Sequence, residues 1–181
     1  DIIKGTKVRS ITVPKTLERA VNYGPFAGAE YLTEVNFEYG TANIVYYLCR
    51  GIPNIERIEI PDTVTVISDS AFKDCEKLKE VIIPDSVVEI KGSAFENCKS
   101  LENFKMPQYL TCLWDNIIKG TRVKSVTVPK TLERTVNHGP FAGAEYLTEV
   151  NFEHGTTNIV DYLCREIPNI EKIEIPDTVT V

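Results

Sequence analysis

The sequence predicts an α/β fold: a right-handed solenoid with one parallel β-sheet on one side and short turns or one-turn helices opposite. Three observations lead to this prediction. A seven-residue pattern, Leu-x-x-Val-x-Ile-Pro, occurs eight times, with conservative replacements at the apolar positions and with the proline in six of the eight. Successive occurrences begin 22 to 24 residues apart, and self-similarity at such a period is typical of stacked repeats. Residues 117–181 also differ from residues 2–66 at only ten positions.

The pattern divides the chain into eight units of about 23 residues. The two near-identical segments are offset by 115 residues, which equals five such units. We therefore infer a duplicated block and predict a single domain over residues 1–181, in which residues 117–181 are a near-copy of residues 2–66. The units begin at Val8, Leu32, Ile55, Leu78, Leu101, Val123, Leu147 and Ile170.

Each unit is predicted to open with a strand. In the fourth unit, Val81 and Ile83 alternate with positions that are polar in most units, which is the period of a half-buried strand. Pro84 should end the strand, because proline has no N–H for the hydrogen-bond ladder. Asp85 and Ser86 follow as turn residues, because their short side chains bond to nearby backbone.

The rest of each unit is predicted to return the chain to the next strand. Val87 and Ile90 are inward apolar positions on this return path. Phe95 and Cys98 lie three residues apart, so one helical turn would place both on the inner face. No single unit can bury these side chains, but stacked units can do so by forming continuous apolar rows.

Stacking predicts regular rows at the strand positions as well. At the exposed positions, the sign of the charge alternates from unit to unit along Glu34, Arg57 and Glu80. Opposite charges on neighbouring strands attract, so this alternation favours the proposed register. The predicted apolar row at the strand centres consists of Val35, Ile58, Val81 and Phe104.

The extended pattern L-x-x-V-x-I-P-[DS]-S-V-x-x-I-x-x-x-A-F-x-x-C resembles the leucine-rich repeat of the BspA-like, treponemal type. Residues 55–107 match it most completely, and the flanking units match its strand part best. The asparagine ladder of ordinary leucine-rich repeats is missing, which agrees with this subclass. The resemblance implies a curved leucine-rich-repeat solenoid on a large surface-exposed or secreted bacterial protein that binds other macromolecules.

Composition excludes several classes of partner. The net charge is -6 and no cluster of Lys or Arg occurs, so nucleic acid and anionic membrane surfaces are not expected to bind. No apolar run approaches the roughly 18 residues of a membrane span. The chain opens at Asp1 and both ends fall inside a unit. We therefore expect the natural protein to continue beyond one or both ends, or the ends to associate with other copies.

The five cysteines are predicted to be buried free thiols. Cys75 and Cys98 occupy a position that holds Gly, Ala or Ile in other units, and the acceptance of Gly and Ala there indicates a small buried group. A disulfide between these two residues stays an alternative, because bridging depends on their Cβ geometry. No metal site is expected, because no C-x-x-C or Cys/His pair has ligand spacing.

No catalytic set is apparent either. His138 and His154 are the only histidines, and Tyr23 and Tyr39 replace them in the first copy. A general base or metal ligand would not be expected to alternate with tyrosine between two near-identical copies. Bases interleave with the stacked acids, which disfavours a calcium site. We therefore expect no enzymatic activity and no cofactor.

The exposed face of the sheet is the predicted interaction surface. It is polar apart from Ile82. Aromatic residues, among them the sole tryptophan, Trp114, offer the best hint of binding, with packing between units as the alternative. The partner-binding residues predicted on this face are Asn36, Arg57, Glu59, Glu80, Ile82 and Lys105.

The sequence therefore predicts a non-enzymatic protein-interaction or adhesion module of a bacterial cell-surface or secreted protein, with the location implied by the resemblance alone. The expected partner is a host matrix protein, another surface protein or a glycan. The alternative is a structural spacer or stalk that carries another domain away from the cell surface. The near-copy favours this alternative, because length can be selected without a particular binding face. A third hypothesis is that the chain positions an enzymatic or regulatory domain located elsewhere in a longer protein.

Overall fold

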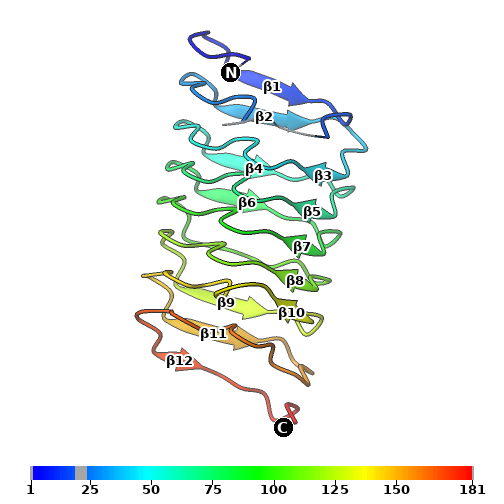
Figure 1. Cartoon of the computed structure of the whole chain (residues 1–181), viewed down its shortest axis with the longest axis vertical. Helices are drawn as coiled ribbons and strands as arrows, with labels where there is room; N and C mark the ends of the chain where they lie inside the picture. Colours follow the sequence, from blue (N-terminus) through cyan, green and yellow to red (C-terminus); the bar gives the residue numbers. More distant parts are fainter. Residues whose placement is uncertain (1, 19–23, 181) are drawn as a thin grey trace.

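In the computed structural model, which describes residues 2–18 and 24–180, each repeat unit forms one coil and successive coils lie on one another (Figure 1). The paired strands are parallel, and their register is one repeat unit, as in Ser10 with Glu34 and Arg57 with Glu80. The stacked coils and their predicted register are confirmed. Short turns lie opposite the first set of strands, whereas the alternative of one-turn helices is wrong for the described residues, which contain no helix.

Seven of the eight predicted strand positions form strands, and these pair into three short sheets. The sheets are β1-β2, β4-β6 and β9-β11-β12. The predicted single sheet is therefore interrupted between β2 and β4, and again at residues 103–106, which form no strand. The seven strands are β1 (Ser10–Val13), β2 (Glu34–Phe37), β4 (Arg57–Glu59), β6 (Glu80–Ile82), β9 (Ser125–Val128), β11 (Glu149–Phe152) and β12 (Lys172–Ile173).

A second parallel sheet, which the sequence did not predict, runs along the return path. Its order is β10-β8-β7-β5-β3 (Figure 1). Each of its strands has two residues, which is too short for an alternating pattern to be visible in the sequence. Val87 and Ile90 on this path are fully buried, as predicted. The strands are β3 (Asn43–Ile44), β5 (Val66–Ile67), β7 (Glu89–Ile90), β8 (Cys112–Leu113) and β10 (Arg134–Thr135).

The turns of neighbouring coils are joined by backbone hydrogen bonds. Asp74 N–H donates to the Glu96 carbonyl at 2.8 Å, and Asn97 N–H donates to the Lys119 carbonyl at 2.7 Å. Asp74 and Asn97 both have a positive φ, at 62° and 60°. This left-handed conformation suits Gly, Asn and Asp better than other residues, because a Cβ makes it unfavourable.

The two copies offer a test of this conformational cost. Glu166 has a φ of 57°, and its counterpart Gly51 has a φ of 70° with open space where a Cβ would lie. We expect Glu166→Gly to raise the free energy of unfolding by about 0.5–1 kcal/mol, because it relieves the left-handed strain. Its exposed ion pair with Arg165 contributes little. Urea denaturation would measure the change, with Gly51→Ala as the matched opposite; a destabilised Glu166→Gly variant would contradict the prediction.

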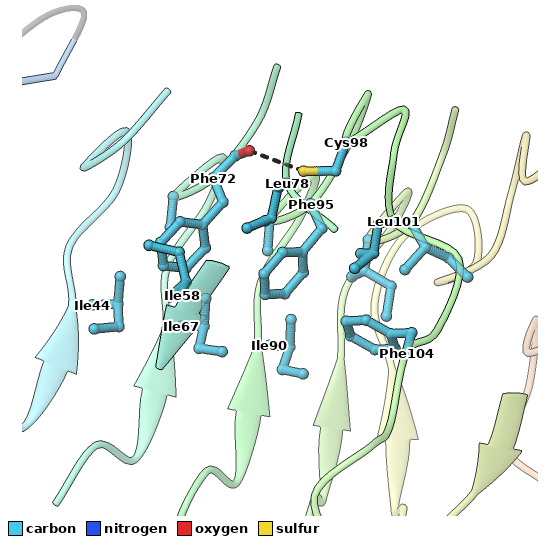
Figure 2. Close-up of a cluster of buried hydrophobic side chains, with 14 of the residues drawn as sticks. Ile44, Ile58, Ile67, Phe72, Leu78, Ile90, Phe95, Cys98, Leu101 and Phe104 are labelled. Carbon is cyan, nitrogen blue, oxygen red and sulfur yellow. Dashed lines mark hydrogen bonds between the residues drawn. The ribbon is translucent and has the colours of Figure 1, made fainter. Parts of the chain in front are cut away.

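The core is a row of apolar side chains between the two strand sides (Figure 2). At the strand centres Val35, Ile58 and Phe104 are buried, whereas Val81 is half-buried and packs against the same core. Phe95 stacks on the ring of the preceding coil, Phe72, with centroids 5.3 Å apart. It meets Phe104 edge-to-face at 5.3 Å. The predicted apolar row is therefore confirmed, with Val81 less buried than expected.

The cysteines are free thiols, so the alternative of a Cys75–Cys98 disulfide is wrong. The Cys75 thiol donates a hydrogen bond to the Cys49 carbonyl at 3.0 Å, and the Cys98 thiol donates to the Phe72 carbonyl at 3.2 Å (Figure 2). Burial raises the pKa of Cys75 to about 12, and it raises the pKa of Cys98 well above its ordinary value. Such thiols act as small apolar groups with a weak donor.

Burial makes the reactivity of the thiols predictable. Cys164 is only partly buried, whereas Cys49, Cys75, Cys98 and Cys112 are buried. In native protein at pH 8 we expect iodoacetamide to modify Cys164 first, with the other four reacting only on unfolding. Mass spectrometry of the alkylated peptides would check this. Fast modification of Cys75 in folded protein would contradict it.

The raised pKa of Cys75 also predicts a dependence of stability on pH. Between about pH 9 and pH 12 an unfolded thiol loses its proton while the folded Cys75 thiol keeps it. The unfolded state then binds fewer protons, so the free energy of unfolding should fall as the pH rises through this window. Urea midpoints at pH 8 and pH 10.5 would show the loss, and Cys75→Ala should reduce it.

Candidate interaction surface

All six predicted partner-binding residues are exposed on one side of the solenoid. We call this side the sheet face: the outward side chains of β1, β2, β4, β6, β9, β11, β12 and residues 103–106. The alternation of strand residues explains the exposure, because each inward neighbour such as Ile58 belongs to the core. Nothing in the structure tests binding, so their role stays a prediction. The exposed residues are Asn36, Arg57, Glu59, Glu80, Ile82 and Lys105.

Three of these residues form one ionic cluster. The Arg57 guanidinium contacts Glu80 through Nε and Glu59 through Nη2, both at 2.9 Å. The hydrogen bond that Arg57 donates to Glu59, followed by the one it donates to Glu80, raises the pKa of Arg57, because both carboxylates favour the charged guanidinium. The predicted Arg57–Glu80 contact across the strands is therefore present. Glu34 instead accepts a hydrogen bond from Asn36 Nδ2 at 3.1 Å.

A groove of about 740 Å³ lies on the sheet face where β2 and β4 belong to separate sheets. We call it the first groove. Asn36, Arg57, Glu59 and Ile82 line it, so the structure brings together four of the six predicted residues. Its apolar surface includes the half-buried Phe37. Glu80 is joined to its lining through Arg57.

A second groove of about 550 Å³ lies beside residues 103–106, the segment without a strand. Lys105 lines this groove together with Asp85 and Glu153, above the buried side chains of Phe104 and Met106. Lys105 is therefore placed apart from the other predicted residues, at a separate site on the same face.

Sequence reasoning missed two acidic residues and a partly exposed aromatic residue of the first groove. Glu34 and Phe37 flank the predicted Asn36 in β2, and Asp62 follows β4. The equivalence of Glu34 to Arg57 in the repeat could have identified Glu34. Asp62 holds the turn position that Asp85 holds in the fourth unit, and its proximity to β2 could not be predicted because it depends on how two coils pack. The break between β2 and β4 has no signal in the sequence.

The remaining candidates are dispersed. Trp114 is half-buried, and its Nε1 donates to Glu89 at 2.8 Å, so it serves packing between coils. His138 and His154 are exposed at separate places. Within residues 2–18 and 24–180, no three His, Cys, Asp or Glu side chains are grouped to hold a metal ion. The same ranges contain no helix that could cross a membrane.

The repeat and its geometry agree with a known family model. A model described as the BspA type leucine-rich repeat region, in six copies, matches residues 2–117 and 65–181. The chain belongs to the BspA-type leucine-rich repeat family. The predicted resemblance is therefore confirmed over nearly the whole sequence, including the units that match the pattern loosely.

Solved structures of bacterial proteins share the BspA-type fold of this chain. A T. pallidum leucine-rich repeat protein is 21% identical, with a TM-score of 0.66 over 93% of this chain and 76% of that chain. A leucine-rich repeat protein from Eubacterium ventriosum is 24% identical, with a TM-score of 0.62 over 71% of this chain. A leucine rich cell surface protein from Faecalibacterium prausnitzii is 21% identical, with a TM-score of 0.58 over 94% and 60% of the two chains.

These similarities confirm the solenoid fold. The matched region spans 34% of the E. ventriosum chain, so that protein extends well beyond the part that is similar. The comparison with curated proteins found no match. The surface of the chain itself is therefore the basis for inferring its binding partner.

Proposed function

We propose that this chain is a non-enzymatic interaction module of a bacterial cell-surface or secreted protein, and that it binds a protein partner through the sheet face. One observation carries the proposal: two grooves with charged rims and apolar floors lie on the face that the repeat leaves free. Apolar area combined with charged groups is what protein interfaces use for affinity and specificity. A surface location is supported by the F. prausnitzii relative, which is described as a cell surface protein.

The chemistry of the grooves favours binding over catalysis. Neither groove has a histidine or cysteine in its lining, and the Arg57 guanidinium of the first groove is held between two carboxylates. Histidine is the most frequent general acid or base in catalysis and an activated thiol is a frequent nucleophile, and neither is present in these two linings. A host matrix protein or another bacterial surface protein is the proposed partner, with a glycan as the alternative ligand.

A matched pair of substitutions tests the sheet face. Ile82 on the sheet face is 38% exposed, and Val88 on the return path is 36% exposed, so both can accept arginine without disturbing the core. Binding would be measured against immobilised matrix proteins, surface proteins of the source bacterium and a glycan array. We expect Ile82→Arg to weaken binding of the selected partner at least tenfold and Val88→Arg to change it less than twofold. Equal losses in both variants, or no binding partner, would overturn the proposal.

A structural spacer is the second candidate function, and the near-copy of residues 2–66 in residues 117–181 favours it. In a spacer the number of coils determines the reach of an attached domain. Deletion of one 115-residue repeat period from the full-length protein on cells should then bring the attached domain closer to the cell surface. Reduced binding of an antibody to that domain would show the change. Under this alternative, Ile82→Arg should have no effect on function.

A further inference from the structure

The first groove carries uncompensated negative charge. Glu34, Glu59 and Asp62 line it, and Glu80 adjoins it, whereas Arg57 is its single cation. Arg57 pairs with Glu59 and Glu80, so the four carboxylates and one guanidinium leave three net negative charges. Within residues 2–18 and 24–180, Glu34 and Asp62 have no basic partner. The groove is thus complementary to a basic ligand.

The first groove also has partly exposed apolar side chains in its lining. Phe37 is half-buried at the end of β2, and Ile82 exposes 38% of its surface at the end of β6. Apolar side chains left uncovered between charged groups can gain energy from an apolar group on a partner. A ligand for this groove therefore needs an apolar side chain between its basic ones.

Residues 117–181, the second copy, show that the uncompensated charge of Glu34 depends on how neighbouring coils pack. Glu149 and Lys172 are the counterparts of Glu34 and Arg57, and β11 pairs with β12 directly. Lys172 Nζ contacts Glu149 at 3.0 Å and Glu174 at 2.7 Å, so Glu149 has a cation beside it. In the first copy the next coil supplies Glu80, and Arg57 contacts Glu80 instead. Glu34 is consequently left without a cation although its local sequence matches that of Glu149.

We propose that the first groove binds an extended segment of a partner protein that carries two basic residues four positions apart with an apolar residue midway. This inference rests on the proposed function. Glu34 holds the third position of its repeat unit and Asp62 the eighth. Ile82 and Phe37 hold the fifth and sixth positions of their units, between the two acids along the repeat. In an extended peptide, residues i, i+2 and i+4 face one side and span about 13 Å. The flexible stems of lysine or arginine let the two basic groups reach carboxylates beyond this span.

The probe is the fluorescein-labelled peptide Gly-Lys-Ser-Leu-Ser-Lys-Gly, and its control, Gly-Lys-Lys-Ser-Leu-Ser-Gly, has the same composition with adjacent lysines. Fluorescence anisotropy at 50 mM and 150 mM salt would compare them. We expect the first peptide to bind at least fivefold tighter than the control, with weaker binding at the higher salt concentration. Equal binding of the two peptides would overturn the proposed spacing.

Two double variants that remove matched charges test whether the peptide binds at the first groove. Glu34→Gln with Asp62→Asn should weaken binding of the first peptide at least tenfold. Glu149→Gln with Asp177→Asn removes the same charges from the equivalent residues of the second copy and should change it less than twofold. Similar losses in both double variants would indicate nonspecific attraction and overturn the proposal. Circular dichroism and thermal unfolding would establish that both double variants are folded.

A third variant should act in the opposite direction. Arg57→Gln removes the cation that pairs with Glu59 and Glu80, so we expect the first peptide to bind at least threefold tighter. Weaker binding would contradict the assigned role of Arg57.

The experiments distinguish a failure of this inference from a failure of the proposed function. If no peptide binds while a partner sensitive to Ile82→Arg is found, only the inference fails. If no such partner is found either, both fail.

Discussion

Replacing Ile58 with alanine is expected to lower the free energy of unfolding by about 3 kcal/mol, whereas the same replacement at Ile173 should cost less than about 1 kcal/mol. The two isoleucines are equivalent in the two copies, and each is followed by Glu-Ile-Pro. Ile58 is 1% exposed, whereas Ile173 is 42% exposed. The two side chains therefore have the same following residues in the sequence but differ in their burial by neighbouring coils.

The reason for this difference is the following coil. β6 pairs with β4 and closes the core over Ile58, whereas β12 has a pairing strand, β11, on one side within the described residues 2–18 and 24–180. Removing a buried side chain costs the lost transfer free energy and leaves a cavity, but removing a half-exposed one leaves none. Urea denaturation followed by circular dichroism would give the two values. Stacked repeats can unfold in parts, so hydrogen exchange at each coil should accompany it. Equal costs at the two positions would contradict the argument.

The largest expected loss of stability is for Phe95→Ala, at about 4 kcal/mol. Phe95 is fully buried, and its ring contacts Phe72 of the preceding coil and Phe104 of the following strand position. The substitution would remove both ring contacts and leave a cavity that spans three successive coils. It should therefore weaken their cohesion in addition to removing buried apolar area.

Phe95→Leu is the control for this prediction. Leucine keeps most of the buried volume but loses the ring contacts, so we expect a cost of about 1.5 kcal/mol. Thermal and urea unfolding of both variants would give the comparison. A loss below 1 kcal/mol for Phe95→Ala would mean that the aromatic row does not hold the coils together.

The exposed residues of the candidate site could be predicted from alternation in the strands. Asn36, Arg57, Glu59 and Ile82 line the first groove, because outward positions of stacked strands share one face. The separation of β2 from β4 could not be predicted, since residues of both strands recur almost unchanged in β11 and β12, which do pair. The position of Lys105 at a second groove likewise depends on the loss of a strand at residues 103–106.

The amino-acid sequence predicts the period of the coils, their parallel direction and their register, because apolar residues spaced by about 23 positions can be buried only when successive units lie on one another. It also determined which strand residues point outward. Three features depend on the tertiary structure: the formation of the second sheet, the places where the first sheet is interrupted, and the lack of a cation beside Glu34 in the described residues. The physical reason is that each coil receives its cover and its ionic partners from the neighbouring coil, so near-identical segments acquire different surroundings.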